Sequence, residues 1–200
     1  YKTGAHIHPI IPGHEFSGKV IDTFDKESEW NGKRVGIFPL IPCGECPCCK
    51  KKMYEMCSNY NYLGSRCNGG FAEYVAVPEW NLIELPDNVS YEQAAMMEPM
   101  AVALHAVRRF NIPDDASVYV IGLGTIGLLL TMFLKARGIQ NIYVVGNKEM
   151  QKHFVVRLGI DEQHYNADSI QADYVFECVG KNDTVNRAIE FAVSAGHIVL

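Results

Sequence analysis

The fold class follows most clearly from one glycine-rich segment, Val118-Tyr119-Val120-Ile121-Gly122-Leu123-Gly124-Thr125-Ile126-Gly127. Its first four residues predict a buried strand, and the apolar run after the glycines predicts a helix. In such a Gly-x-Gly-x-x-Gly turn the first glycine makes the tight turn, the second lets the backbone approach a pyrophosphate, and the third allows close helix–strand packing. The amides at the helix start then face the phosphate charge. We therefore expect dinucleotide contacts at Gly122, Gly124, Thr125, Ile126 and Gly127.

The segments around this turn alternate between strands and helices. We expect strands at 117–121, 141–145, 172–178 and 197–200, and helices at 125–137, 148–158 and 182–194. This alternation predicts a parallel sheet, and it favours a dinucleotide turn over the alternative, an ordinary βα turn. A doubly wound dinucleotide fold normally has six strands, so we expect a truncated Rossmann-type sheet.

The second of these strands ends in Gly146-Asn147-Lys148. An Asp or Glu normally stands here in NAD-binding folds and binds the adenosine ribose. A carboxylate would repel a 2′-phosphate, whereas Gly146 leaves room for one and Asn147 and Lys148 can donate to it. We therefore expect NADP to be favoured over NAD. After the third strand, the backbone of Val179 and Gly180 is expected beside the nicotinamide.

The residues before about 88 have a different texture, rich in glycine, proline and short apolar alternations. We expect strands at 16–23, 33–38, 71–77 and 81–85, separated by turn signals. This pattern predicts an irregular all-β domain.

The junction between the two textures is helical. Ser90 followed by Gln93 forms a capping box, which predicts a helix through 94–97. Pro99 lacks an amide hydrogen, so it breaks or kinks this helix or opens a second one through 101–110. We therefore expect two domains, residues 1–98 and 99–200.

Five cysteines crowd into one loop of the first domain, at Cys43, Cys46, Cys48, Cys49 and Cys57. Structural zinc takes four thiolates in a tetrahedron, and Cys-x-x-Cys turns supply them in pairs. Three lysines at 50–52 are placed to offset the negative charge of such a site. A loop of free or disulfide-bonded cysteines is the alternative. Spacing alone does not separate Cys48 from Cys49 as a ligand.

His14 and Glu15 form a second pair of metal-ligand types, within Pro12-Gly13-His14-Glu15-Phe16-Ser17-Gly18. Taken alone, such a pair is also common in surface turns.

The order of these features resembles the medium-chain zinc-dependent alcohol and polyol dehydrogenases. A Gly-His-Glu-x-x-Gly, a four-cysteine lobe, a Gly-Gly-Phe-Ala-Glu-Tyr segment at 69–74 and the glycine turn follow one another as they do in that family. The resemblance covers essentially the whole chain. It implies a GroES-like irregular β domain with a structural zinc lobe, followed by a Rossmann domain. The implied lobe ligands are Cys43, Cys46, Cys49 and Cys57, without Cys48.

The resemblance also assigns the second metal site. His14 matches a ligand of the catalytic zinc, and Glu15 matches the carboxylate beside it. Glu98, in Met97-Glu98-Pro99, is similar to the glutamate of sorbitol and galactitol-1-phosphate dehydrogenases, where alcohol dehydrogenases usually place a cysteine. A carboxylate on a helix surface is the alternative for Glu98.

The family carries a further cysteine ligand upstream, and no cysteine precedes Cys43. We expect the chain to begin just after that turn and, on its own, to be inactive. His6 and His8 are the alternative ligands, although we expect them to be exposed loop histidines.

The implied reaction moves a hydride between a secondary alcohol of a polyol, or polyol phosphate, and NAD(P). The implied catalytic residues are His14, Glu15 and Glu98, with one structural and one catalytic zinc and assembly as a homodimer or homotetramer. A zinc-free quinone reductase is one alternative, but that class lacks a four-cysteine lobe. A zinc-ribbon nucleic-acid module is another, but it would not explain the glycine turn.

The composition limits the partners. The formal net charge is −5, whereas a nucleic-acid surface is usually basic. No apolar run approaches the roughly 20 residues of a membrane helix. No leader is visible, and crowded cysteines favour a metal site in a reducing compartment. We therefore expect a cytoplasmic protein that binds a small alcohol and neither nucleic acid nor membrane.

Overall fold

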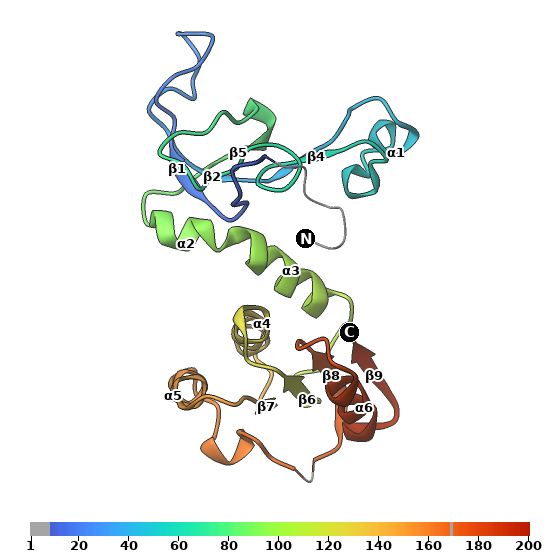
Figure 1. Ribbon diagram of the computed structural model, residues 1–200. Helices are drawn as coiled ribbons and strands as arrows, with labels where there is room; N and C mark the ends of the chain where they lie inside the picture. The colour runs from blue at the N-terminus through green and yellow to red at the C-terminus, as the bar shows by residue number, and fades with distance from the viewer. Residues whose placement is uncertain (1–8, 169) are drawn as a thin grey trace. The chain divides into compact units, whose positions relative to one another are not determined.

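The computed structural model describes residues 9–168 and 170–200 (Figure 1). It consists of two compact units, Tyr1–Glu98 and Pro99–Leu200, so that the division falls within helix α3 (Met97–Arg108). His6 and His8 lie outside the described residues. No helix among the described residues has the length and apolar character needed to cross a membrane.

The first unit is built from short antiparallel strands. One sheet has the order β1 (Ser17–Lys19), β2 (Arg34–Ile37) and β5 (Leu82–Glu84). A second pairs β3 (Leu40–Ile41) with β4 (Asn61–Tyr62). Val35, Ile37 and Leu63 form the buried centre, and Phe16, Val20 and Trp30 are among the side chains packed on it. The short elements of this unit are α1 (Pro47–Lys50), η1 (Tyr54–Met56) and η2 (Glu79–Asn81).

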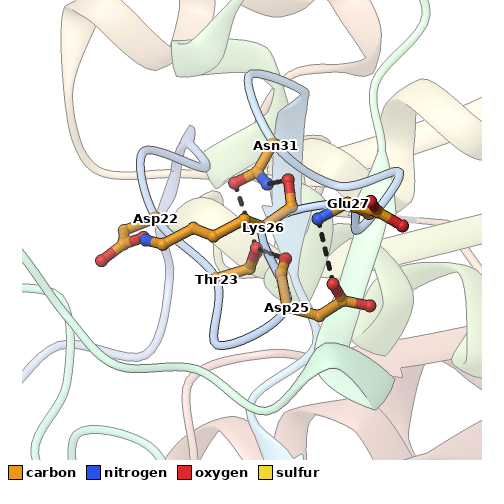
Figure 2. A network of polar contacts seen from close by, with 6 residues as sticks. All are labelled: Asp22, Thr23, Asp25, Lys26, Glu27 and Asn31. Atoms are coloured by element: carbon orange, nitrogen blue, oxygen red, sulfur yellow. Dashed lines mark hydrogen bonds and ion pairs between the residues drawn. The ribbon is translucent and has the colours of Figure 1, made fainter.

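The loop from β1 to β2 closes on itself through polar contacts (Figure 2). Asn31 Nδ2 donates to the carbonyl of Lys26 at 3.0 Å, and the Thr23 hydroxyl donates to Asn31 Oδ1 at 3.1 Å. Lys26 pairs with Asp22, and the backbone amide of Glu27 donates to Asp25. These groups are exposed and satisfy one another, so they hold the loop in shape.

The expected strand at 71–77 is wrong, because this segment forms no strand. The backbone amides just before it and at its first residue bond to the turn before His14 instead of to a sheet. Gly69 donates to Ile11 at 2.8 Å, Gly70 to Gly13 at 2.9 Å, and Phe71 to Pro12 at 3.0 Å. The expected strand at 16–23 is likewise shortened to β1.

The junction has the expected capping box. The Ser90 hydroxyl accepts from the Gln93 amide at 3.2 Å, and Gln93 Oε1 accepts from the Ser90 amide at 2.9 Å. Helix α2 (Tyr91–Ala95) follows, and α3 begins at Met97. Pro99 therefore falls in the first turn of α3, where an amide hydrogen has no acceptor within the helix.

The second unit contains a parallel sheet with the order β7-β6-β8-β9. Strands β6 (Ser117–Ile121) and β7 (Asn141–Val145) are in register from Ser117 against Asn141, and β8 (Ala172–Glu177) pairs with the other side of β6. Helices α4 (Thr125–Ala136), α5 (Glu149–Arg157) and α6 (Asn182–Phe191) alternate with these strands, and η3 (Glu162–His164) precedes β8. The bridge from Val144 to Tyr165 continues the sheet beyond β7.

Strand β9 (Ala192–Val199) begins earlier than the expected strand at 197–200. Helix α6 ends at Phe191 because Ala192 is already extended, with φ −79° and ψ 134°. A bulge then absorbs the residues up to Gly196, with Ala195 at φ +64°. From His197 onward the strand pairs regularly with β8.

Candidate metal centres and dinucleotide turn

Four of the five crowded cysteines converge. The sulfur atoms of Cys43, Cys46, Cys49 and Cys57 all lie within 4.8 Å of one another. The Sγ atoms of Cys43 and Cys49 are 4.0 Å apart, as are those of Cys46 and Cys57. A tetrahedron of Zn–S bonds of ~2.3 Å separates its sulfurs by about 3.8 Å. The donor set therefore fits zinc in both chemistry and spacing.

Backbone amides point at two of these sulfurs. Cys46 caps the start of α1, where its Sγ accepts from the Cys49 amide at 3.4 Å, and Cys57 Sγ accepts from the Cys43 amide at 3.3 Å. The amides of Cys49 and Ser58 lower the pKa of Cys46 to about 6, and the Cys43 amide lowers the pKa of Cys57. Burial raises the pKa of Cys49 to about 12. The backbone amides thus favour the thiolate form of Cys46 and Cys57, whereas burial disfavours that of Cys49.

The fifth cysteine of the loop, Cys48, is not part of the cluster. It occupies α1 next to Cys49, and successive residues of a helix face different directions. Cys49 is 4% exposed and faces the other sulfurs. The geometry thus separates the two neighbours that spacing alone left equivalent.

A second cluster contains His14, Glu15 and Glu98, whose ligand atoms lie within 4.8 Å of one another. His14 Nε2 is 4.0 Å from Glu15 Oε1. One imidazole nitrogen and two carboxylate oxygens are ligands that zinc accepts, at about 2.0–2.2 Å each. The residues present therefore fit a divalent cation. Glu98 comes from the first turn of α3, more than eighty residues after the other two.

Tyr62 on β4 contacts two members of this cluster. Its hydroxyl donates to Glu98 Oε1 at 3.0 Å, and its ring meets the His14 ring edge-on, with centroids 5.7 Å apart. Burial and the Glu98 carboxylate raise the pKa of Tyr62 above its ordinary value of 10.0. Tyr62 therefore stays a hydrogen-bond donor and orients Glu98.

Glycines set the position of His14. Gly13 has φ +102°, and a Cβ on it would lie 2.7 Å from the Phe71 ring. A Cβ on Gly64 or on Gly69 would overlap the Gly13 carbonyl group. Three glycines from separate segments thus pack backbone on backbone directly before His14.

The Gly-x-Gly-x-x-Gly turn has the geometry that its glycines predict. Gly122 has φ +94°, and a Cβ there would overlap the Val179 side chain. A Cβ on Gly127 would overlap the Gly122 carbonyl oxygen, whereas one on Gly124 would meet no protein atom within 4 Å. Gly124 and Thr125 are exposed at the start of α4, and Ile126 is half-buried. The turn is therefore tight where the protein packs and open at the helix start, as a bound pyrophosphate requires.

Val179 lies at the carboxyl end of β8, beside this turn. The Glu177 carboxylate accepts from the amide of Val179 at 2.8 Å and from that of Gly180 at 3.0 Å. The Cys178 amide donates to Ile121 at 2.8 Å. These bonds fix the loop at the edge where ligands of such sheets bind, and Val179 is 42% exposed there.

The loop after β7 carries two exposed side chains, those of Asn147 and Lys148. Among the residues that the structure describes, Lys148 forms no ion pair. A larger residue in place of Gly146 would meet two side chains: its Cβ would lie 2.6 Å from Gln151 Oε1 and 2.9 Å from the Tyr165 hydroxyl oxygen. Sequence reasoning missed Gln151 and Tyr62, because their partners Leu123 and Glu98 are 28 and 36 residues away.

Comparison with known families identifies the first unit. The family model of the alcohol dehydrogenase GroES-like domain matches residues 1–87. Together with the parallel sheet of the second unit, this match confirms the expected fold class.

Curated relatives extend the similarity over both units. The galactitol 1-phosphate 5-dehydrogenase of Escherichia coli K12 is 33% identical over 96% of this chain and 59% of its own length. The (R,R)-butanediol dehydrogenase of Bacillus subtilis is 34% identical over 96% of this chain and 58% of its own. The chain thus spans about three fifths of the curated relatives it matches.

Solved structures agree. A protein of Sinorhizobium meliloti 1021, described as a zinc-binding dehydrogenase and solved with NADP, superposes with a TM-score of 0.84 at 28% identity, over 96% of this chain and 61% of its own. A protein of Escherichia coli CFT073, described as a short chain alcohol dehydrogenase and solved with NADH, has a TM-score of 0.83 at 27% identity, over 100% and 65%. Relatives of this fold therefore bind either nicotinamide coenzyme.

Proposed function

The chain belongs to the medium-chain zinc-dependent alcohol and polyol dehydrogenases, and on that premise we propose that it carries the metal and coenzyme sites of an enzyme that oxidises a polyol or polyol phosphate with NADP. The convergence of His14, Glu15 and Glu98 carries this proposal. A structural lobe alone would serve a binding module, whereas a second, carboxylate-rich cluster in the same unit suits metal-assisted chemistry.

Two zinc sites with different roles are proposed. Cys43, Cys46, Cys49 and Cys57 hold a structural zinc that braces the loop around α1. His14, Glu15 and Glu98 contribute to a catalytic site. When bound, zinc there supplies a Lewis acid for the substrate hydroxyl, and the nicotinamide supplies the hydride acceptor.

The residues of this chain orient those groups. Tyr62 donates to Glu98 Oε1 and so orients the carboxylate that lies near His14 and Glu15. Gly122, Gly124 and Gly127, with the amides of Thr125 and Ile126, would bind the coenzyme pyrophosphate, and the backbone of Val179 would line the nicotinamide site. The carboxylates of Glu15 and Glu98 offset the charge of a divalent cation, and a vicinal diol is proposed as the further ligand. The choice of a polyol rests on the family resemblance.

NADP is proposed over NAD because Gly146 supplies no carboxylate that would repel a 2′-phosphate. Asn147 and Lys148 are exposed donors beside it. Titration of the protein with NADPH and with NADH, followed by coenzyme fluorescence, measures the preference. Tighter binding of NADPH supports the proposal, and equal or tighter binding of NADH contradicts it.

The activity is tested with the protein expressed from its complete coding sequence. NADPH formation is measured with galactitol 1-phosphate, sorbitol and 2,3-butanediol. We expect turnover of at least one, its loss in Glu98→Gln, and its retention in Glu190→Gln, which changes an exposed glutamate of α6. Metal-free protein that reduces quinones would support the quinone reductase alternative, and a salt-dependent shift on nucleic acid would support the zinc-ribbon alternative. Assembly as a homodimer or homotetramer, and a cytoplasmic location, stay predictions.

A further inference from the structure

Gln151 ties together two loops at the carboxyl edge of the sheet. It is the third residue of α5 and is half-buried. Its Oε1 accepts from the amides of Asn147 at 3.0 Å and Lys148 at 3.1 Å, and its Nε2 donates to the Leu123 carbonyl at 2.6 Å. Leu123 lies between the first two glycines of the dinucleotide turn. The Gln151 side chain therefore links the loop after β7 to the loop after β6 through hydrogen bonds to both.

The same amide oxygen closes the space at Gly146. A Cβ on Gly146 would lie 2.6 Å from Gln151 Oε1, 2.9 Å from the Tyr165 hydroxyl oxygen and 3.1 Å from Leu123 Cδ1. The Tyr165 hydroxyl is itself held by the Lys148 carbonyl at 3.2 Å. Gly146 has no positive φ, so its backbone would accept a side chain. The obstacle is the far ends of the Gln151 and Tyr165 side chains, and moving Gln151 aside would break its bonds to Asn147, Lys148 and Leu123.

An acidic residue at position 146 meets two obstacles. Its Cβ overlaps the Gln151 amide oxygen, and its carboxylate would lie beside that partly negative oxygen. Conversely, removal of the Gln151 side chain opens the space and frees the amides of Asn147 and Lys148. The identity of residue 146 is therefore coupled to Gln151.

The geometry points to Gln151 as a positioning residue that determines coenzyme choice: it presents Asn147 and Lys148 to the 2′-phosphate and excludes the carboxylate that would recognise an unphosphorylated ribose. This inference rests on the proposed function. It adds that the preference belongs to Gly146 and Gln151 as a pair.

The first test is the Gln151→Ala variant. NADPH affinity is expected to fall about tenfold or more, since donors to a charged phosphate lose their orientation. NADH affinity falls less, because only the shared pyrophosphate turn loses a tether. Gln163→Ala, at an exposed glutamine with no role in either loop, is the matched control and leaves both affinities unchanged.

The second test is a double-mutant cycle with Gly146→Asp, read by coenzyme binding and not by turnover. Gly146→Asp alone loses NADPH without gaining NADH. Gly146→Asp with Gln151→Ala binds NADH about tenfold or more tightly than Gly146→Asp alone. Equal NADH binding by the single and double variants would overturn the inference while leaving the proposed function intact. Wild-type protein that binds neither coenzyme would overturn both.

A ligand-free measurement covers the case in which Gly146→Asp does not fold. Gly146→Ala adds only the Cβ that meets Gln151 Oε1. Its melting temperature is expected to fall in the wild-type background and to fall distinctly less in the Gln151→Ala background. The same decrease in both backgrounds would show that Gln151 does not limit position 146, and would overturn the inference.

Discussion

Tyr62 donates its hydroxyl to the carboxylate of Glu98 at 3.0 Å while its ring meets the His14 imidazole edge-on. One half-buried phenol thus contacts two of the three members of the His14 cluster. A metal-ligating side chain that a neighbouring hydrogen bond holds in one orientation binds the metal more tightly than a mobile side chain does.

Tyr62→Phe should therefore weaken metal binding at the proposed catalytic site without unfolding the unit. The ring is kept, and only the bond to Glu98 is lost. We expect the affinity of this site for zinc to fall about 10- to 100-fold, with turnover falling in parallel. Zinc retention during dialysis against a chelator measures it. Tyr74→Phe, at an exposed tyrosine, is the control, and equal zinc retention in both variants would contradict the assigned role.

Cys48 and Cys49 give a matched pair in adjacent positions. Cys49→Ser should lose the structural zinc, because it removes one of four converging sulfurs, whereas Cys48→Ser should retain it. Metal analysis after purification counts the zinc, and a thiol reagent counts the cysteines released when the lobe opens. Loss of zinc in Cys48→Ser with retention in Cys49→Ser would reverse the assignment.

The close backbone packing of Gly13, Gly64 and Gly69 before His14 should tolerate no added side chain. A Cβ on Gly69 overlaps the Gly13 carbonyl, and backbone cannot move aside as a flexible side chain does. We expect Gly69→Ala to destabilise the protein by about 3 kcal/mol or more. Gly18→Ala is the control, since a Cβ there meets no atom within 4 Å. Urea unfolding curves that coincide for the two variants would show that the backbone packing at Gly69 leaves room for a side chain.

Asp173 gives a pH-dependent contribution to stability. Its carboxylate accepts from the Ser117 hydroxyl at 2.7 Å and the Ser117 amide at 2.9 Å, joining the starts of β6 and β8. These bonds hold the pKa of Asp173 below its ordinary value of 3.8. The stabilisation is therefore present above that value and is lost as the pH falls through the lower folded-state value.

Asp173→Asn should accordingly lower the unfolding free energy at pH 7 by about 1 kcal/mol, because hydrogen bonds to a charged acceptor become neutral ones. The difference from wild type should shrink as the pH falls below 3.8. Urea unfolding at a series of pH values measures it, with Asp114→Asn, at an exposed aspartate, as the control. A difference that does not change with pH would rule out the charged bond as its source.

Local sequence patterns predict the bounds of most helices and strands of the second unit. Strands β6 and β7 have the expected bounds because each is a short apolar run before a turn. Helices α4 and α5 end just before Gly138 and Gly159, which take the left-handed conformation that ends a helix.

Contacts between distant residues account for what the sequence did not reveal. The residues at 71–77 alternate like a strand, but the neighbouring amides are used by the turn before His14. The start of β9 depends on a bulge against β8. Gln151 looked like an ordinary residue of a helix, and only folding brings it to Leu123 and Gly146.

We propose that this protein holds a second zinc at His14, Glu15 and Glu98, apart from the zinc of the cysteine lobe. Anomalous X-ray scattering above and below the zinc absorption edge, from crystals of the protein expressed from its complete coding sequence, tests it most directly. We predict two zinc peaks per chain, one among the four cysteine sulfurs and one within bonding distance of His14. A single peak at the cysteines, with none at His14, would contradict the proposed second zinc site.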